Sequence, residues 1–159
     1  MAIHVRDARL EDSRTVIRLA QELSVIENQP LDFDAARYVA GCFGPHRTLD
    51  TLIAERHGRT AGYLTSRRIN DKAAGGPSRV VFDLCVDEPA RRHGVARALL
   101  SHVATTMLSQ GELMLTVATS LSNHAARQTY EALGARQDRL AVYCWSGASL
   151  IALAGFGDI

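Results

Sequence analysis

Lysine is almost missing from this sequence of 159 residues, because Lys72 is the only one and arginine supplies every other basic side chain. Neither sign of charge dominates, since 18 basic and 17 acidic residues give a formal net charge of +1. A chain this close to neutrality is not typical of a dedicated nucleic-acid-binding protein, although a local basic patch is compatible with the composition. Long apolar runs are missing too, and none approaches the roughly 18 residues that a membrane span needs. We therefore expect neither nucleic acid nor a membrane as a partner.

Cysteine is scarce, and its three copies, Cys42, Cys85 and Cys144, include no C-x-x-C pair. This odd number of unpaired cysteines argues against a disulfide framework and against a zinc knuckle. No two of the six histidines are four residues apart, and none lies near a cysteine in a ligand pattern, so we predict no metal site. The N-terminal sequence MAIHVRDARLED carries charges where a secretory leader needs an apolar run. These features predict reduced thiols and a cytoplasmic protein.

The length, with 47% hydrophobic and 22% charged residues, fits one globular domain over residues 1–159. Apolar periodicity and turn residues predict an alternation of strands and helices. The predicted elements are a strand over Ala2–Arg6, a helix from Glu11 through Ile26, a helix from Asp32 or Asp34 to Cys42, strands over Thr48–Arg56, Thr60–Ile69 and Arg79–Val86, a helix over Val95–Leu108, a strand over Leu113–Ala118, a helix over Asn123–Leu133 and a strand over Ala141–Trp145. Together they indicate an α/β domain with an antiparallel first half and a strand–helix–strand crossover behind it.

Two segments stand apart from this pattern. The polar, glycine-rich segment Asn70–Ser78 is predicted as a flexible turn. The tail Ser146–Ile159 is too apolar to remain free in water, so we expect it to pack against the body or against a partner subunit. Trp145, at the end of the last predicted strand, is expected in the core.

The segment from Leu84 to Leu100 holds the strongest indication of chemistry. A buried strand ends at Val86, and a helix starts near Gly94, so unpaired N–H groups and the positive end of the helix dipole are exposed there. Gly94 has no Cβ, which lets a phosphate approach the backbone, and Arg91 and Arg92 add positive charge. The alternative is an ordinary strand–helix turn with solvated arginines.

Other phosphate-binding motifs are missing. Gly94 is the only glycine from Arg79 to Gln110, so no G-x-G-x-x-G follows the strand. Lys72 does not belong to a G-x-x-x-x-G-K-[ST] sequence. Both a dinucleotide-binding fold and a P-loop are therefore disfavoured.

Two motifs resemble the GCN5-related N-acetyltransferase (GNAT) superfamily. The sequence RRHGVA at 91–96 is similar to the family's Q/R-x-x-G-x-G/A, and it follows a strand (VFDLCV) and precedes an apolar helix as in that family. The sequence NHAARQTYEALGA at 123–135 is similar to N-x-x-A-x-x-x-Y-x-x-L-G-F, with Ala135 in place of the aromatic residue. The resemblance implies a mixed, mostly antiparallel central sheet with a splayed parallel strand pair and flanking helices.

The resemblance also implies a binding site for acetyl-CoA. Its pyrophosphate would lie on the amides of the loop from Arg91 to Ala96, and its pantetheine arm would pair with an exposed strand edge, as an added strand does. Asn123 resembles the family asparagine that hydrogen-bonds the cofactor, although a helix N-cap is an alternative role. The implied cofactor-binding residues are Leu84 and Val86 through their amides, Arg91, Arg92, His93, Gly94, Val95, Ala96 and Asn123.

Tyr130 lies at the position of the family tyrosine that faces the cofactor sulfur. A phenol has a reference pKa of about 10 and a thiol about 8.5, so a tyrosine stays protonated and can donate to a departing thiolate. The alternative is a core tyrosine that packs over the cofactor without transferring a proton.

The group that accepts the proton of the attacking amine is left open. Several relatives place a glutamate on the strand before the loop, but the corresponding positions here are the apolar Val80 and Phe82. Asp83 is the only carboxylate of that strand and is a candidate for substrate contact or structure. Glu27 is a second candidate for substrate contact. Further candidates are Glu22, His46 and His124.

The resemblance therefore implies an acetyl-CoA-dependent N-acetyltransferase that moves an acetyl group to a primary amine by direct attack in a ternary complex. A small-molecule amine or an amino-acid-like acceptor is favoured over a histone-type peptide, because no extra peptide-binding domain is expected. The alternative is a catalytically silent GNAT-fold protein that binds CoA as a sensor or partner subunit. A longer acyl group and a homodimer are further possibilities that the family allows.

Overall fold

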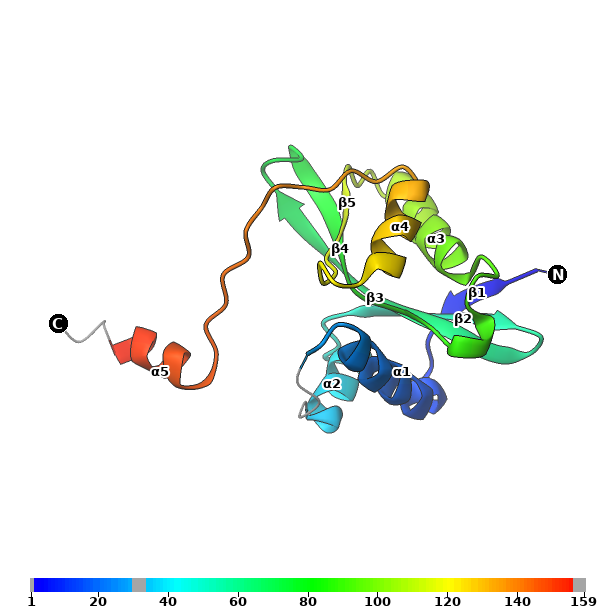
Figure 1. Cartoon of the computed structure of the whole chain (residues 1–159), viewed down its shortest axis with the longest axis horizontal. Coiled ribbons are helices and arrows are strands. Elements are labelled where there is room, and N and C mark those ends of the chain that lie inside the picture. The colour runs from blue at the N-terminus through cyan, green and yellow to red at the C-terminus, as the bar shows by residue number, and fades with distance from the viewer. Residues whose placement is uncertain (1, 30–33, 156–159) are drawn as a thin grey trace.

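The computed structural model describes residues 2–29 and 34–155 and contains a five-stranded mixed sheet in the order β1-β2-β3-β4-β5 (Figure 1). The first four strands are antiparallel neighbours, and β4 and β5 are parallel. The strands are β1 (His4–Asp7), β2 (Asp50–Arg56), β3 (Arg59–Asp71), β4 (Gly76–Val86) and β5 (Leu115–Val117). The helices are α1 (Ser13–Ile26), α2 (Ala35–Cys42), α3 (Val95–Ser109), α4 (His124–Ala132) and α5 (Gly147–Gly155), with short 3-10 helices at Leu10–Asp12 and Glu88–Ala90. The predicted fold class is confirmed.

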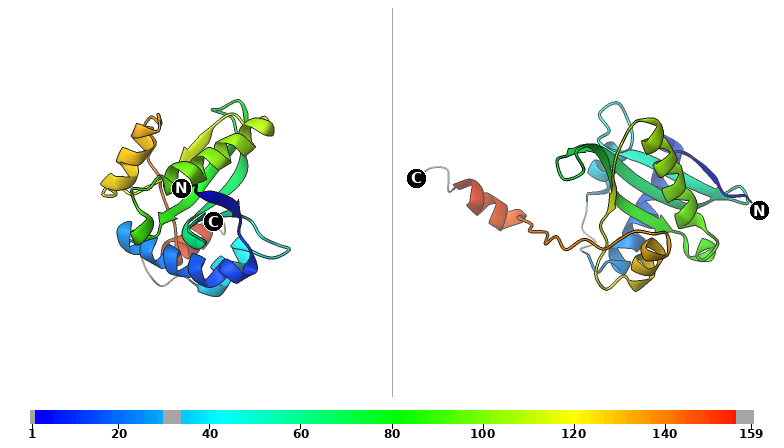
Figure 2. Two further views of the ribbon diagram at one scale, coloured as in Figure 1. Left: turned by 90° about the vertical axis from the view of Figure 1, so that its right-hand side faces the viewer. Right: turned by 90° about the horizontal axis from the view of Figure 1, so that it is seen from above.

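Helices cover both faces of the sheet, with α3 on one face and α1 and α2 on the other (Figures 1 and 2). The side chains of a strand alternate between the two faces, so Leu52 packs under α3 while its neighbour Ile53 packs under α1. Leu99 of α3 and Leu19 of α1 are fully buried in the two cores. Each such side chain stabilises the fold by about 1.5–3 kcal/mol. Asp34 begins α2 by accepting from the amides of Ala36 and Arg37, whereas Asp32 lies outside the described residues.

Strands β4 and β5 separate soon after they start. Their pairing is confined to Arg79–Val81 against Leu115–Val117, although β4 continues to Val86. The register of β3 against β4 shifts between Thr65 and Ser66, which leaves Phe82 as an extra residue of β4 at the point of separation. This confirms the splayed parallel pair and leaves one edge of β4 without a neighbouring strand beyond Val81 in the described part of the sheet.

The turn expected over Asn70–Ser78 is shorter than predicted. Strands β3 and β4 continue toward each other until Asp71 pairs with Gly76, and only the residues between them turn. Each strand supplies hydrogen-bond partners for the other, which outweighs the weak strand propensity of the polar segment. No helix in the described ranges is long and apolar enough to cross a lipid bilayer.

The predictions for the C-terminal part of the chain were wrong. The stretch Ala141–Trp145 forms no strand, because no other described segment pairs with it. Trp145 is 54% exposed and lies outside the core. Residues 147–155 of the tail form α5, which lies apart from the body in Figure 1 and in the right-hand view of Figure 2, while residues 156–159 lie outside the described residues. Packing of the tail against its own body is therefore contradicted, and packing against a partner stays a prediction.

Candidate active site

The loop between β4 and α3 presents a run of free backbone N–H groups. Arg92 (φ 63°) and Gly94 (φ 83°) are both in the left-handed region, which turns successive amides outward before α3 begins at Val95. The first amide that joins the helix is that of Ala98, which donates to Gly94 O over 2.9 Å. Nowhere in residues 2–29 and 34–155 is there an acceptor for the amides of residues 92–97. Such a run at the start of a 15-residue helix is suited to bind an anion.

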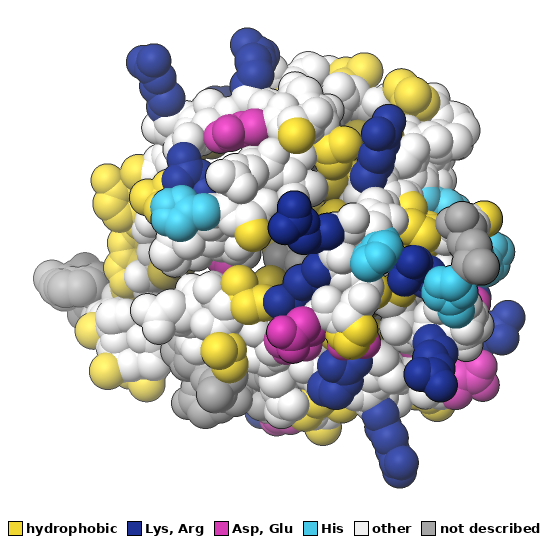
Figure 3. All heavy atoms as spheres, turned by 45° about the vertical axis from the view of Figure 1, so that its right-hand side comes forward, with side chains coloured by type: hydrophobic (Ala, Val, Ile, Leu, Met, Phe, Trp, Pro, Cys, Tyr) yellow, Lys and Arg dark blue, Asp and Glu magenta, His cyan; other side chains and the backbone are white. Residues whose placement is uncertain are grey.

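The basic residues of this loop have different surroundings. Arg91 donates from Nε to Val86 O over 3.1 Å and forms an ion pair with Glu22 of α1, so its charge is compensated. Arg92 is exposed and has no ion pair within the described ranges. His93 donates from Nδ1 to Arg91 O over 2.7 Å. Figure 3 brings forward the side of the molecule that carries β1 and the start of α3, and basic side chains are spread over it. Arg92 is thus the loop cation that is free to meet an anion.

The amides of Leu84 and Val86 point to the open edge of β4. The amide of Asp83 donates to Thr65 Oγ1 on β3, and the amide of Asp87 donates to Ala61 O of the same strand. Successive amides of an antiparallel strand point to opposite edges, so those of Leu84 and Val86 point away from β3. That edge is the one from which β5 has separated. It can therefore accept an extended ligand as an additional strand.

Asn123 and Glu27 form one hydrogen-bonded unit. Asn123 Oδ1 accepts from the amide of Ala126, which confirms the N-cap role, and its Nδ2 donates to Glu27 over 2.6 Å. The same carboxylate accepts from Thr119 Oγ1 (2.6 Å) and from the amide of Ser120 (2.5 Å). Glu27 therefore fastens the end of α1 to the loop between β5 and α4. One hydrogen of the Asn123 amide remains for a ligand.

Tyr130 on α4 is held in its protonated form. Burial raises its pKa to about 12, and the nearby Glu27 carboxylate adds to the effect. The hydroxyl has no hydrogen-bond partner among the residues that the structure describes. At neutral pH it is therefore a proton donor without an acceptor in the described part of the chain.

Asp83 lies in a cluster of hydroxyl groups on the α1–α2 side of the sheet. Its Oδ2 accepts from Tyr38 and from Thr65 Oγ1, both over 2.7 Å, and Tyr63 donates to the Tyr38 hydroxyl over 3.2 Å. Burial raises the pKa of both tyrosines, so these hydroxyls remain donors. The described part of the chain provides Asp83 with no cationic partner. A partly buried carboxylate without a counter-charge is suited to bind a cation.

Comparisons with known proteins agree with this geometry. The model of the acetyltransferase (GNAT) family matches residues 15–135. The chain belongs to the GNAT family. It is accordingly an acyltransferase, and the resemblance read from the two motifs is confirmed. No curated protein sequence matches it.

Solved structures share the GNAT fold at low sequence identity. An integron cassette protein from the mobile metagenome of V. cholerae superposes with a TM-score of 0.79 at 19% identity, over 97% of this chain and 98% of that one. A ribosomal-protein-alanine N-acetyltransferase from Brucella melitensis biovar Abortus 2308 superposes with a TM-score of 0.76 at 17% sequence identity. The match covers 91% of this chain and 100% of that one. The aminoglycoside N-acetyltransferase AAC(6')-Iy, in complex with CoA, superposes with a TM-score of 0.73 at 18% sequence identity. The match covers 91% of this chain and 95% of that one.

The other side chains predicted for the GNAT site differ in their exposure and in their partners. Glu22 is occupied by its ion pair with Arg91. His46 and His124 are exposed, and neither imidazole has a partner within the described residues. Phe82, one of the two strand positions considered for a glutamate, is 51% exposed. No group of three or more His, Cys, Asp or Glu side chains in the described ranges is placed to hold a metal ion.

Sequence reasoning missed the tyrosines around Asp83. Strand alternation could have found Tyr63 and Thr65, because they lie on the same face of β3 that Asp83 occupies on β4. No local sequence pattern could have identified Tyr38, which lies on α2 and donates to Asp83 from 45 positions away in the sequence.

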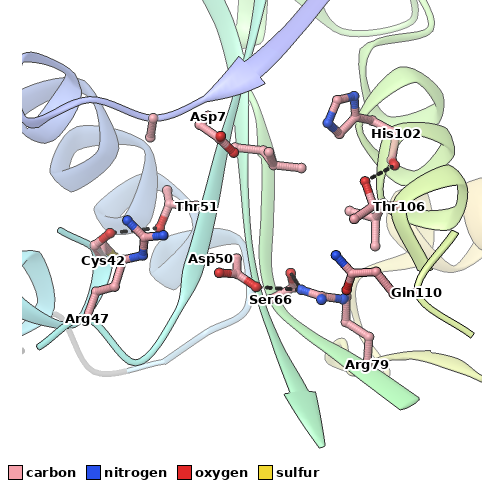
Figure 4. A pocket seen from close by; sticks show the side chains of 13 residues that line it. Asp7, Cys42, Arg47, Asp50, Thr51, Ser66, Arg79, His102, Thr106 and Gln110 are labelled. Atoms are coloured by element: carbon pink, nitrogen blue, oxygen red, sulfur yellow. Dashed lines mark hydrogen bonds and ion pairs between the residues drawn. The ribbon is translucent and has the colours of Figure 1, made fainter. Parts of the chain in front are cut away.

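A separate pocket of about 290 Å³ lies between the start of β2 and the second half of α3 (Figure 4). Arg79 lines it and is ion-paired with Asp50 (2.6 Å) and Glu112 (2.9 Å), so its charge is compensated. His102 and Gln110 line it from α3. None of the residues predicted for the GNAT site borders this pocket, so it lies apart from that site.

Proposed function

We propose that this GNAT protein transfers the acetyl group of acetyl-CoA to the primary amine of a small molecule, by direct attack in a ternary complex. The observation that supports it most is the run of unpartnered amides over residues 92–97 at the start of α3. Most of these residues are exposed, so their N–H groups are open to a ligand that supplies acceptors, and the positive end of the helix dipole favours an anion. A diphosphate has the required charge and number of oxygens.

The residues present fit the rest of the cofactor. Arg92 supplies an uncompensated positive charge beside the amide run. A Cβ on Gly94 would meet nothing closer than Ile3 Cδ1 at 4.0 Å, so the loop is open where the diphosphate binds. The amides of Leu84 and Val86 face the open strand edge and would pair with the amide-containing arm. When bound, the cofactor supplies an acetyl group activated as a thioester.

Tyr130 serves as the general acid. With a pKa of about 12 the phenol keeps its proton at neutral pH, and in this proposal it donates that proton to the sulfur as the carbon–sulfur bond breaks. Its hydroxyl is not engaged elsewhere in the described structure. The direction of transfer, from hydroxyl to sulfur, follows from the need to neutralise the charge that develops there.

Asp83 binds the acceptor. Its Oδ2 accepts from Tyr38 and Thr65, while Oδ1 has no partner and the carboxylate no counter-charge among the described residues. An ammonium group, which is the main form of a primary amine at neutral pH, satisfies both needs. The aminoglycoside acetyltransferases among the similar structures are named for acceptors of this chemical class. Glu27, whose carboxylate is already occupied by three donors, acts instead by positioning the loop before α4.

The test combines calorimetry with a turnover assay. Titration of CoA should give saturable binding, and thioester consumption over a panel of small amines should give turnover. Gly94→Glu should abolish the binding, because it places a carboxylate against the diphosphate. Gly58→Glu is the matched control, since Gly58 also has a left-handed backbone (φ 70°) but lies in the β2–β3 turn. Equal CoA affinity in the two variants would overturn the proposal.

Binding without transfer is the second candidate. The apolar Phe82 and Val80, at the two strand positions considered for a glutamate, favour it. Saturable CoA binding with no thioester consumption on any amine would establish this sensor or partner-subunit role instead.

A further inference from the structure

Phe82 and Asp83 lie side by side on the same face of β4. Val81 and Leu84 both pack in the core under α3, and a regular strand places a single residue between two neighbouring side chains of one face. Here two residues separate them, because the register of β3 against β4 shifts at this point. Counted by alternation from either end, Phe82 and Asp83 both face the side of α1 and α2, where the Asp83 carboxylate meets Tyr38. The extra residue therefore adds a second side chain to the face that carries Asp83.

The helices leave the ring of Phe82 uncovered on this face. Phe82 is 51% exposed, whereas Cys85, the residue of β4 that follows Asp83 on the same face, is 3% exposed. Strand β5 does not extend beside Phe82 either, because its pairing with β4 ends at Val81. An aromatic ring that is open beside a partly buried carboxylate offers apolar ligand atoms a surface on which they leave water.

Asp83 supplies the charged half of this surface. Its Oδ2 accepts from Tyr38 and Thr65, and its Oδ1 has no partner among the residues that the structure describes. Consecutive Cα atoms are about 3.8 Å apart, so an ammonium group on Oδ1 has the carbon atoms next to its nitrogen within reach of the Phe82 ring. The face of an aromatic ring also attracts the same positive charge. One ligand can therefore use both side chains at once.

The partners of the nearby carboxylates limit the ligand to a single positive charge. Glu22 and Glu27 are the acidic side chains in the second half of α1 and just after its end. Glu22 pairs with Arg91, and Glu27 accepts from three donors. A second ammonium group would therefore find no free carboxylate on these residues. Hydroxyl groups placed against the ring of Phe82 would lose hydrogen bonds to water without gaining a partner.

We infer that the acceptor is a monoamine whose ammonium group binds Asp83 and whose apolar body, alkyl or aromatic, packs on Phe82. This inference rests on the proposed function, because it names the acceptor class of the same site. Phe82 acts as a specificity-determining residue and takes no part in proton transfer. Aminoglycosides, for which one of the similar structures is named, are polyhydroxylated amines and fall outside this narrower class.

A matched panel of amines tests the acceptor class. Hexylamine and phenethylamine have apolar bodies, glucosamine has a hydroxylated body, and diaminobutane has a second ammonium group. With acetyl-CoA saturating, we expect kcat/KM for the two apolar monoamines to be about tenfold or more above that for the other two, because only the apolar bodies gain from burial on the ring. An equal or higher kcat/KM for glucosamine or diaminobutane overturns the inference and leaves acetyl transfer established.

Variants of Phe82 assign the preference to its ring. Phe82→Ser should lower kcat/KM for hexylamine about tenfold and leave that for glucosamine nearly unchanged, because only the apolar contact is lost. Phe82→Leu keeps an apolar side chain and should recover most of the hexylamine rate. Leu108→Ser replaces an exposed leucine of α3 and should change neither amine. An unchanged ratio of the two amines in Phe82→Ser, or no recovery in Phe82→Leu, contradicts packing of an apolar body on Phe82.

Calorimetry on the protein saturated with CoA tests the same contact without any transfer. Hexylamine should bind more tightly than glucosamine, and hexanol, which has the apolar body without the ammonium group, should not bind measurably, because Asp83 then has no cation. Saturable CoA binding with equal affinity for the two amines overturns this inference alone. Absence of saturable CoA binding overturns the proposed function and this inference with it.

Discussion

The side-chain amide of Asn123 donates to Oε1 of Glu27 over 2.6 Å, across 96 positions of sequence. This contact fastens the N-terminus of α4 to the end of α1. Thr119 and Ser120 donate to the same carboxylate, so one side chain fixes the whole connection between β5 and α4. Because Tyr130 lies on α4, its position depends on Glu27.

Glu27→Ala should lower the free energy of unfolding by about 1–2 kcal/mol, because it leaves three partly buried donors to find water. It should also lower the pKa of Tyr130 from about 12, although burial, the larger cause, will keep it above the ordinary value. Urea unfolding and ultraviolet titration of the tyrosines measure the two effects. Glu11→Ala, at an exposed carboxylate near the start of α1, is the control and should change neither. Equal stability of the two variants would contradict the positioning role.

Tyr130→Phe should reduce kcat about 100-fold or more, the usual contribution of a positioned general acid, and leave the affinity for CoA unchanged. With a pKa of about 12, the hydroxyl stays protonated through neutral pH, so deprotonation of Tyr130 should not lower the rate between pH 6 and pH 10. Steady-state kinetics and calorimetry measure the two parameters. Tyr143→Phe, in the exposed segment after α4, is the control for loss of a phenol. A kcat equal to that of the wild type would leave Tyr130 only a packing role.

The parts of the fold that could be predicted from the sequence are those with local causes. The stretch around Val81 and Cys85 is apolar on both faces, and the helix from Val95 to Met107 has one apolar stripe, so both elements form as expected. The stretch Ala141–Trp145 has an equally strong local pattern, but a strand there needs a neighbour that none of the described segments provides. Strand propensity alone therefore could not show whether the partner strand is present.

The difference between features with local causes and features that need distant residues also applies to the site. The amide run follows from a strand end, Gly94 and a helix start, all of which are visible in the sequence. The ion pair of Arg91 with Glu22 and the hydrogen bond of Tyr38 to Asp83 join residues 69 and 45 positions apart. Such contacts depend on how α1 and α2 pack on the sheet. For that reason the charge of Arg91 looked free in the sequence and is compensated in the structure.

Asp83→Asn should raise the KM for the amine by about 10–100-fold, the range for loss of a hydrogen bond to a charged group, with CoA affinity unchanged. The asparagine keeps an oxygen that can accept from Tyr38 and Thr65, so the fold should be preserved. Initial rates at varied amine concentration measure the change. Asp87→Asn removes a carboxylate just beyond β4 that pairs with Arg18, and serves as the control. An unchanged KM would remove Asp83 from the acceptor site.

The ion pair between Arg6 and Asp12 should make the stability of the protein depend on pH in acid. Arg6 donates to both oxygens of Asp12, over 2.8 and 3.0 Å, and lowers the pKa of that nearly buried carboxyl group. A carboxyl group whose pKa is lower when folded contributes stability that is fully present above its unfolded pKa of about 4. That contribution decreases as the pH falls through the folded pKa.

Asp12→Asn should therefore cost about 2 kcal/mol of unfolding free energy at pH 7, and the difference from the wild type should shrink below pH 4. Urea unfolding at pH 7, 4 and 2.5 measures it. Glu11→Gln, one position away, removes an exposed carboxylate 3.6 Å from Arg9, and exposed ion pairs contribute little. This control should match the wild type at every pH. A constant difference between Asp12→Asn and the wild type down to pH 2.5 would show that the Arg6 contact acts through packing and not through the charge of Asp12.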